Sequence, residues 1–427
     1  MGMIQTVVQA WRIPEMRKKM IFTFFMLVIF RIGSNIPVPF INRELLQSMF
    51  DANTSGLFGL FDLFSGGSFS NFTIFALSIT PYITSSIILQ LLTIAIPSLE
   101  ALAKEGEEGR RKIASYTRYI TIVLALIQAI GYTFGLFRNV LTTDSVLVKI
   151  MIVLVLIAGT AFLMWLGEKI DEKGVGNGIS LLIFAGIVSR IPTAVSKTIK
   201  GTVAGTYSIV SVILFCIFAV LVMVGIVLVQ EGTRKIPVQY AKRVVGRKMY
   251  GGQASHLPIK VNQAGVIPVI FATSLLQLPL TFAYMFPTSG FAAWASKWIS
   301  PSGTPGFWVY FIFDMVLIFA FTYFYGSISF NPVEIADNMK NNGGFIPGIR
   351  PGKATSDYIH KVALRLDLVS AIFLAIVSAI PSLLSHWSSL NISFGGTSLI
   401  IAVGVALDTV RALETQMQMR NYQGFLK

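Results

Sequence analysis

The side chains that could support catalysis or metal binding are few in this 427-residue chain. The single cysteine, Cys216, excludes a disulfide framework and a cysteine metal site, and the three histidines show no metal-ligand spacing. The Gly352-Lys353 pair invites comparison with a phosphate-binding loop, but the spacing differs, Ala354 replaces the required Ser or Thr, and no strand precedes it. We expect no catalytic residues, no metal and no cofactor, so any energy source is a partner or the membrane potential.

A different kind of chemistry, the exclusion of water by aliphatic side chains, is offered by residues 78–86. Ile79 and Ile83 are four residues apart, so on a helix they share one face and could form part of an apolar constriction that seals by dewetting. Ordinary helix packing is the alternative explanation, and this stretch alone favours it.

Composition indicates which elements must position these residues. The chain is 54% hydrophobic and 13% charged, with a mean hydropathy of +0.70, which is typical of a multi-pass membrane protein. Apolar runs predict ten spans near residues 20–38, 72–96, 118–137, 147–166, 178–196, 208–229, 265–286, 306–328, 366–385 and 397–414. Arg190 lies within the fifth of these spans, and Arg31, Asp314, Asp367, Asp408 and Arg411 lie toward span ends, where snorkelling or an interfacial ion pair explains them.

The distribution of basic residues supports ten spans with both termini inside. With that topology, 26 of the 34 Lys and Arg residues fall on the inner side and seven on the outer side, with Arg31 inside the first span. Basic residues accumulate in cytoplasmic loops. The fifth and tenth spans are the weakest, and omitting either would move every later loop to the opposite side of the membrane.

Two features of the second span point to a central path. A stub, Leu57 to Phe64, precedes it across Gly66-Gly67 and is too short to cross lipid, so it must lie within protein or a cavity. Residues 81–92 and 268–279 match at five of twelve positions, including the first proline and a glutamine (Gln90 and Gln277). With five spans per half, this similarity indicates an inverted-topology repeat.

Two inner loops are strongly polar. The loop after the sixth span carries seven basic residues against one acid, Glu231, and the loop after the eighth includes Arg350. Such a protruding basic surface suits RNA phosphate or an acidic protein face.

The sequence resembles bacterial SecY, the channel subunit of the Sec translocon, over essentially its whole length. The resemblance rests on the runs beginning at Arg31 (RIGSNIP), Phe64 (FSGG), Gly106 (GEEGRRKIASYTRY), Met164 (MWLGE), Gly176 (GNGIS), His256 (HLPIKVN), Phe345 (FIPGIRPG) and Phe394 (FGGTS).

The resemblance implies an all-α fold in which two inverted five-helix halves, residues 1–204 and 205–427, form a clamshell around an hourglass pore. The second half then carries the cytoplasmic loops 230–262 and 329–366, and the first half carries a plug near 56–67. By motif alignment, the implied site residues are a pore ring of Ile79, Ile83, Ile183, Ile270 and Ile401, a plug with Leu57, Phe58, Leu60, Phe61, Leu63 and Phe64, a lateral gate with Ser86, Gln90, Thr121, Ser274 and Gln277, and partner-binding residues Arg243, Arg247, Lys248 and Arg350.

The function implied by the resemblance is that of a protein-conducting channel in the bacterial plasma membrane, not an enzyme. Unfolded secretory polypeptides cross it, and apolar segments leave sideways into lipid. The implied partners are the SecE and SecG subunits, the SecA ATPase, the ribosome, signal sequences and membrane lipid, with no DNA. The alternatives are a small-solute transporter, a membrane-embedded enzyme and a scaffold without a pore. The first needs a charged or aromatic site at mid-membrane, and the second needs a nucleophile with a base or paired carboxylates inside the spans.

Overall fold

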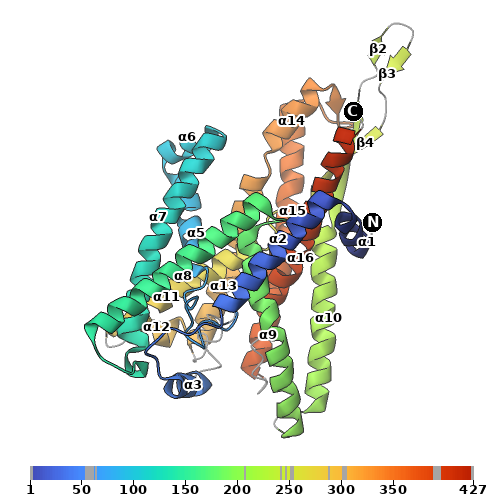
Figure 1. Ribbon diagram of the computed structural model, residues 1–427. Coiled ribbons are helices and arrows are strands. Elements are labelled where there is room, and N and C mark those ends of the chain that lie inside the picture. Colours follow the sequence, from blue (N-terminus) through green and yellow to red (C-terminus); the bar gives the residue numbers. More distant parts are fainter. Residues whose placement is uncertain are drawn as a thin grey trace.

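The long apolar runs form helices in the computed structural model, which describes residues 3–52, 62, 65–205, 208–240, 243–245, 248–250, 254–286, 289–300, 305–387 and 396–424 (Figure 1). The α-helices are α1 (Met3–Arg12), α2 (Pro14–Gly33), α3 (Arg43–Ala52), α5 (Thr80–Ala95), α6 (Pro97–Lys104), α7 (Glu107–Gly131), α8 (Val146–Lys173), α9 (Gly178–Val203), α10 (Ile209–Glu231), α11 (Ile267–Met285), α12 (Gly290–Trp298), α13 (Gly306–Ser329), α14 (Pro332–Asn341), α15 (Lys353–Trp387) and α16 (Gly396–Gly424). A π-helical turn, η1 (Tyr132–Leu136), and a 3-10 turn, η2 (Arg138–Val140), follow α7. The strands are β1 (Thr233–Tyr240), β2 (Arg243–Val245), β3 (Lys248–Tyr250), β4 (Ala254–Lys260) and β5 (Gly344–Phe345).

A helix lies at each of the ten predicted spans. Among the described residues, six helices are long and apolar enough to cross a membrane, and α5 with α6, a pair bent by 101°, would make a seventh. Of the other three, α11 is shorter, and α2 and α16 carry several charged residues. The protein is therefore a mostly helical, multi-pass membrane protein, while the count of ten spans stays a prediction.

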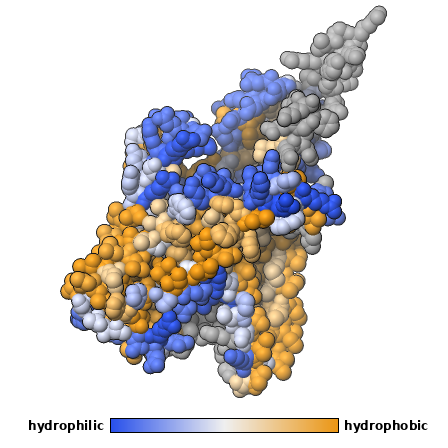
Figure 2. All heavy atoms as spheres, in the orientation of Figure 1, coloured by the Kyte–Doolittle hydropathy of each residue, from blue (hydrophilic) through white to orange (hydrophobic). Residues whose placement is uncertain are grey.

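The outer surface of the helices is apolar, as a lipid-facing surface must be. Orange atoms cover α8 and α10 in Figure 2, and hydrophilic atoms gather above them. On α10, Val210, Leu221 and Leu228 expose 65%, 65% and 67% of their surface. Water would penalise this exposure, whereas hydrocarbon or a partner helix would not.

The second span begins later than the sequence predicted. Residues 65–79 form consecutive, mostly buried turns, and α5 starts only at Thr80. Pro81 lies in the first turn of the helix, where its missing N–H costs nothing. Phe72 and Ser78 have φ values of 42° and 54°, which a right-handed helix does not allow. The expected helix over 72–96, joined directly to Gly66-Gly67, was therefore wrong in its first eight residues.

This turn segment, residues 65–79, is held by its neighbours. The N–H groups of Val38 and Ile74 donate to the carbonyls of Phe72 and Ile36, both at 3.0 Å. Phe72 also packs edge-on against Phe137 with a ring-centroid distance of 4.4 Å. These contacts give the irregular backbone the partners that lipid could not supply.

The two polar segments that the sequence predicted as inner loops contain strands, and pairing between these strands joins the two segments. Strands β4, β1 and β5 form one antiparallel sheet in that order, so the chain after α10 pairs with the chain after α13. Ile236, Ile259 and Ile359 form a small core beneath it. Helix α15 already begins at Lys353, inside the expected loop 329–366 and well before the apolar run that predicted the ninth span, and the cytoplasmic location of that loop stays a prediction.

Two acids expected near span ends are instead buried between α13 and α15. Asp314 and Asp367 expose 5% and 3% of their surface, and the hydroxyl of Ser378 donates to Asp314 Oδ2 at 3.1 Å. Close packing of the two helices covers both carboxyl groups, so interfacial snorkelling was the wrong explanation. Arg411, by contrast, pairs with Asp408 at 3.6 Å as expected.

Candidate functional site

The five isoleucines expected to form a ring belong to one contiguous apolar cluster. Their exposed fractions are 3% for Ile79, 8% for Ile83, 3% for Ile183, 7% for Ile270 and 1% for Ile401. They come from α5 with its N-cap residue and from α9 in the first half of the chain, and from α11 and α16 in the second. Aliphatic side chains from both halves therefore meet inside the protein, and their role as a pore ring stays a prediction.

Local geometry explains how α5 supplies two of these side chains. Ile79 caps the helix with φ −93° and ψ 1°, and its carbonyl accepts the N–H of Ile83 at 3.0 Å. This hydrogen bond is the four-residue helical contact, so both side chains leave the same face, as their spacing predicted. Pro268 occupies the first turn of α11 as Pro81 does in α5, so the repeated prolines start both helices.

The expected gate residues lie on three helices, and one cross-helix contact was missed. The hydroxyl of Tyr325 on α13 donates to Oε1 of Gln90 on α5. Gln90 also donates to the Ser86 hydroxyl at 3.3 Å within α5. The resemblance implies a lateral gate between spans two and three and spans seven and eight, but nothing in the sequence marked Tyr325 among the three tyrosines of the eighth span.

The remaining gate residues are buried and weakly bonded. Thr121 donates to the carbonyl of Thr117 at 2.7 Å within α7, and Ser274 and Gln277 expose 7% and 3% on α11. Gln277 Nε2 has no hydrogen-bond partner among the described residues. In the described part of the chain, the structure gives one hydrogen bond between α5 and α13, and it runs from Tyr325 to Gln90.

The six expected plug residues lie outside the described residues: Leu57, Phe58, Leu60, Phe61, Leu63 and Phe64. The neighbouring Asp62 and Gly66 are described, and both contact basic residues. Asp62 forms an ion pair with Arg190 on α9, and Gly66 O accepts from Arg31 at 3.0 Å. The sequence placed both arginines within predicted spans, but nothing in it linked them to Asp62.

Three of the four expected partner-binding residues lie in the described part of the chain, in two segments joined by one sheet. Arg243 and Lys248 stand in the β2–β3 hairpin, which projects at one tip of the molecule in Figure 1, and Arg247 lies outside the described residues. Arg350 is exposed shortly after β5. Because β5 pairs with the end of β1 that leads to the hairpin, the two basic loops share one sheet.

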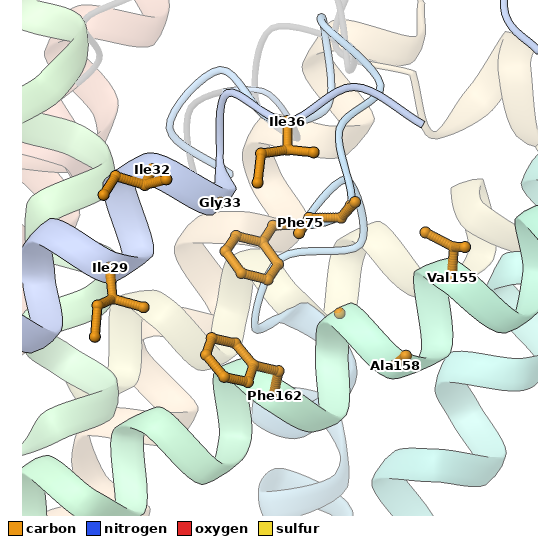
Figure 3. A pocket seen from close by; sticks show the side chains of 10 residues that line it. Ile29, Ile32, Gly33, Ile36, Phe75, Val155, Ala158 and Phe162 are labelled. Carbon is orange, nitrogen blue, oxygen red and sulfur yellow. The ribbon is translucent and has the colours of Figure 1, made fainter. Parts of the chain in front are cut away.

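An apolar pocket of about 620 Å³ lies apart from these residues, between α2, α8 and the turn segment (Figure 3). Phe75 and Phe162 stack across it with centroids 6.0 Å apart. Ile32 and Ile36 line it and expose 60% and 46% of their surface, so it opens outward. It contains none of the predicted site residues.

This architecture defines a class: a multi-pass helical membrane protein with an irregular segment enclosed by protein and a buried aliphatic cluster to which both halves of the chain contribute. The comparisons identify the family. The SecY family model matches residues 73–410, and the chain belongs to that family.

The relatives and solved structures agree with this assignment. A protein translocase subunit SecY of Halalkalibacterium halodurans is 48% identical over 437 residues, covering 100% of both chains. A solved SecY structure, described as showing that the plug domain stabilises the closed state and maintains a membrane seal, is 20% identical with TM-score 0.66, covering 94% of this chain and 92% of that one. Sec61 in a canine ribosome-channel complex is 18% identical with TM-score 0.62 and the same coverage. The structural matches support the fold, and none of these proteins supports a small-solute transporter.

Proposed function

We propose that this chain is a protein-conducting channel that passes unfolded secretory polypeptides across the plasma membrane and releases apolar segments sideways into lipid. Its family membership and the full-length similarity to a translocase subunit support this proposal, and they class it as a channel subunit instead of an enzyme. The observation that carries the mechanism is the cluster containing Ile79, Ile83, Ile183, Ile270 and Ile401, contributed by both halves of the chain.

A ring of isoleucines suits a channel that must stay sealed while accepting many substrates. Aliphatic side chains exclude water and ions and adapt to a passing chain through rotamer changes. They form no specific hydrogen bond that would retain one sequence. The ring therefore separates an inner funnel from an outer funnel between the halves 1–204 and 205–427, with a plug near 56–67 on the outer side.

The sideways exit lies between α5 with α7 and α11 with α13. Separation of these helices needs few strong bonds to be broken, and the Gln90–Tyr325 hydrogen bond is one of them. A single hydrogen bond contributes only about 1 kcal/mol net, so a bound signal sequence can replace it.

The inner sheet and hairpin form the docking surface. Arg243, Arg247, Lys248 and Arg350 supply positive charge for the SecA ATPase or for ribosomal RNA. SecE and SecG cover apolar faces such as that of α10, and both termini lie in the cytoplasm. The contact between α1 and α16, where Thr6 donates to Glu414 at 2.8 Å, supports placing the termini on one side.

Crosslinking to an arrested substrate tests the proposed function. In a Cys216→Ser background, a cysteine at Ile83 or Ile270 is expected to capture a secretory chain halted during translocation, because the ring surrounds it. The matched control is Leu154→Cys on α8, which exposes 61% of its surface outward and should capture none. Equal capture at all three positions, or none at the ring, would contradict the proposal.

Loss of the cross-helix hydrogen bond tests the gate. Tyr325→Phe keeps the ring that packs edge-on against Phe271 at 5.1 Å and removes only the hydroxyl. We expect about a fivefold gain in translocation of a substrate with a weakened signal sequence, since about 1 kcal/mol less holds the gate shut. The measurement is the translocation rate in proteoliposomes, with Tyr323→Phe as control. An unchanged rate would remove Tyr325 from the gate.

A further inference from the structure

Two arginines, one acid and a tight turn meet between α2 and α9, at the described edge of the proposed plug. Arg190 on α9 forms an ion pair with Asp62, whose side chain is 5% exposed. Arg31 on α2 donates to the carbonyl of Gly66 at 3.0 Å. The mechanism proposed above uses none of these contacts.

The turn that contains Asp62 is closed by its own hydrogen bonds. The carbonyl of Asp62 accepts the N–H of Gly67 at 3.0 Å and the hydroxyl of Ser65 at 3.1 Å. Asp62 Oδ1 accepts the N–H of Ser70 at 2.8 Å, which leaves Oδ2 for Arg190. Residues 62 and 65–70, here named the Asp62 turn, therefore form one unit that the two arginines hold from outside.

Glycines bring the Asp62 turn against α9 without interlocking side chains. A Cβ at Gly66 would lie 2.7 Å from Cα of Gly186, so the two backbones touch directly. Gly66 and Gly67 also have φ values of +63° and +94°, a region that favours glycine. Because neither glycine has a side chain to interlock, the turn can separate from α9 without repacking a core. Specific attachment of the turn therefore depends on the arginines.

Burial makes these polar contacts strong. A carboxylate that is almost fully covered must be paired, and removing one partner from a buried ion pair costs several kcal/mol because a charge is left uncompensated. Arg31 is near enough to repel Arg190, and each cation has its own acceptor in the turn. Arg190 pairs with the Asp62 carboxylate, and Arg31 donates to the carbonyl of Gly66. If the Asp62 turn left, both arginines would lose their partners together.

We propose that Arg31 and Arg190 form a two-arginine clamp that holds the Asp62 turn against α2 and α9, and that release of this clamp frees the turn when the channel opens. The release step rests on the proposed channel function, whereas the clamp itself is a property of the resting protein. Arg190 carries the larger part because it compensates a buried charge, and Arg31 adds one hydrogen bond to a carbonyl.

Accessibility of a cysteine at Ser65 tests the clamp without requiring transport. Ser65 is 1% exposed, and Ser65→Cys in a Cys216→Ser background reports whether the turn leaves its site. The assay is the rate of modification by a small charged thiosulfonate reagent applied to both sides of proteoliposomes containing the assembled complex. Arg190→Gln and Asp62→Asn are each expected to raise this rate about tenfold or more, and Arg31→Gln by less.

The charge-exchanged variant, Asp62→Arg with Arg190→Asp, separates an ionic clamp from general damage to the fold. It restores the opposite charges, and we expect its modification rate to fall back toward that of the parent. Single variants that react no faster than the parent overturn the clamp. An exchanged variant that stays as reactive as the single variants, while its melting temperature matches the parent's, also overturns it. Capture of an arrested substrate by Ile83→Cys, measured separately, shows whether the channel function itself holds.

Discussion

Replacing Ile83 and Ile270 together with glycine is expected to raise the resting ion conductance of reconstituted channels at least about tenfold. The two side chains come from α5 in the first half and α11 in the second, and they expose 8% and 7% of their surface in the apolar cluster. Glycine removes the aliphatic groups that keep the constriction dry, so water and ions can enter. The measurement is single-channel current in planar bilayers, without substrate.

The control for this prediction uses two fully buried isoleucines outside the proposed ring. Ile187 on α9 and Ile226 on α10 belong to the same cluster and are 0% exposed. Their double replacement by glycine also loses several kcal/mol of packing and helix stability, but it leaves the ring complete. Similar conductance from both double variants would mean that leak reports loosened packing, and an unchanged conductance in the ring variant would remove the ring hypothesis.

Opposite effects on stability are expected from the same substitution at two helical glycines. Gly159 on α8 faces the turn segment, and a Cβ there would overlap the carbonyl oxygen of Ile74 and lie 2.9 Å from its carbonyl carbon. The backbone cannot yield as a side chain can, so Gly159→Ala should cost about 3 kcal/mol. At Gly225 on α10, the added methyl group would meet only the ring of Phe373 at 3.5 Å, an ordinary contact. Gly225→Ala should therefore be neutral or stabilise by up to about 1 kcal/mol.

Thermal unfolding of the purified complex in detergent measures both variants side by side. The comparison cancels the general effect of exchanging glycine for alanine in a membrane helix, so the difference reports the approach of α8 to the turn segment. If Gly159→Ala were as stable as Gly225→Ala, the turn segment would be free to move away from α8. Its role as a fixed support for the start of α5 would then be wrong.

The sequence predicted the helices well because each span depends on its own residues. Apolar length and the placement of basic residues located a helix at all ten positions, and Pro81 and Pro268 marked the starts of two. The turn segment was missed because Phe72 to Ser78 is as apolar as a helix, and only packing against Val38 and Phe137 makes its irregular backbone stable. The sheet that joins β1 with β5 depends on chain segments about a hundred residues apart, which local patterns do not connect.

The candidate site, too, contains residues that the sequence could predict and residues that it could not. Ile79 and Ile83 could be predicted because helical spacing puts both on one face, and motif alignment supplied Ile183, Ile270 and Ile401. Tyr325 and Asp62 could not, because each acquires its importance from a partner on a distant segment, Gln90 and Arg190 respectively. Pairwise contacts of this kind leave no periodic signal in one sequence.

The inner sheet has a mechanical consequence. Strand β1 continues from α10, β4 leads into α11, and β5 lies between α14 and α15, so one small sheet ties together helices from across the second half of the chain. Ile270 lies in the first turn of α11, shortly after β4 ends at Lys260. If Ile270 lines the pore ring as proposed, a partner that pulls on the β2–β3 hairpin would move the start of α11 at the proposed constriction, and the sheet would spread that force over several helices.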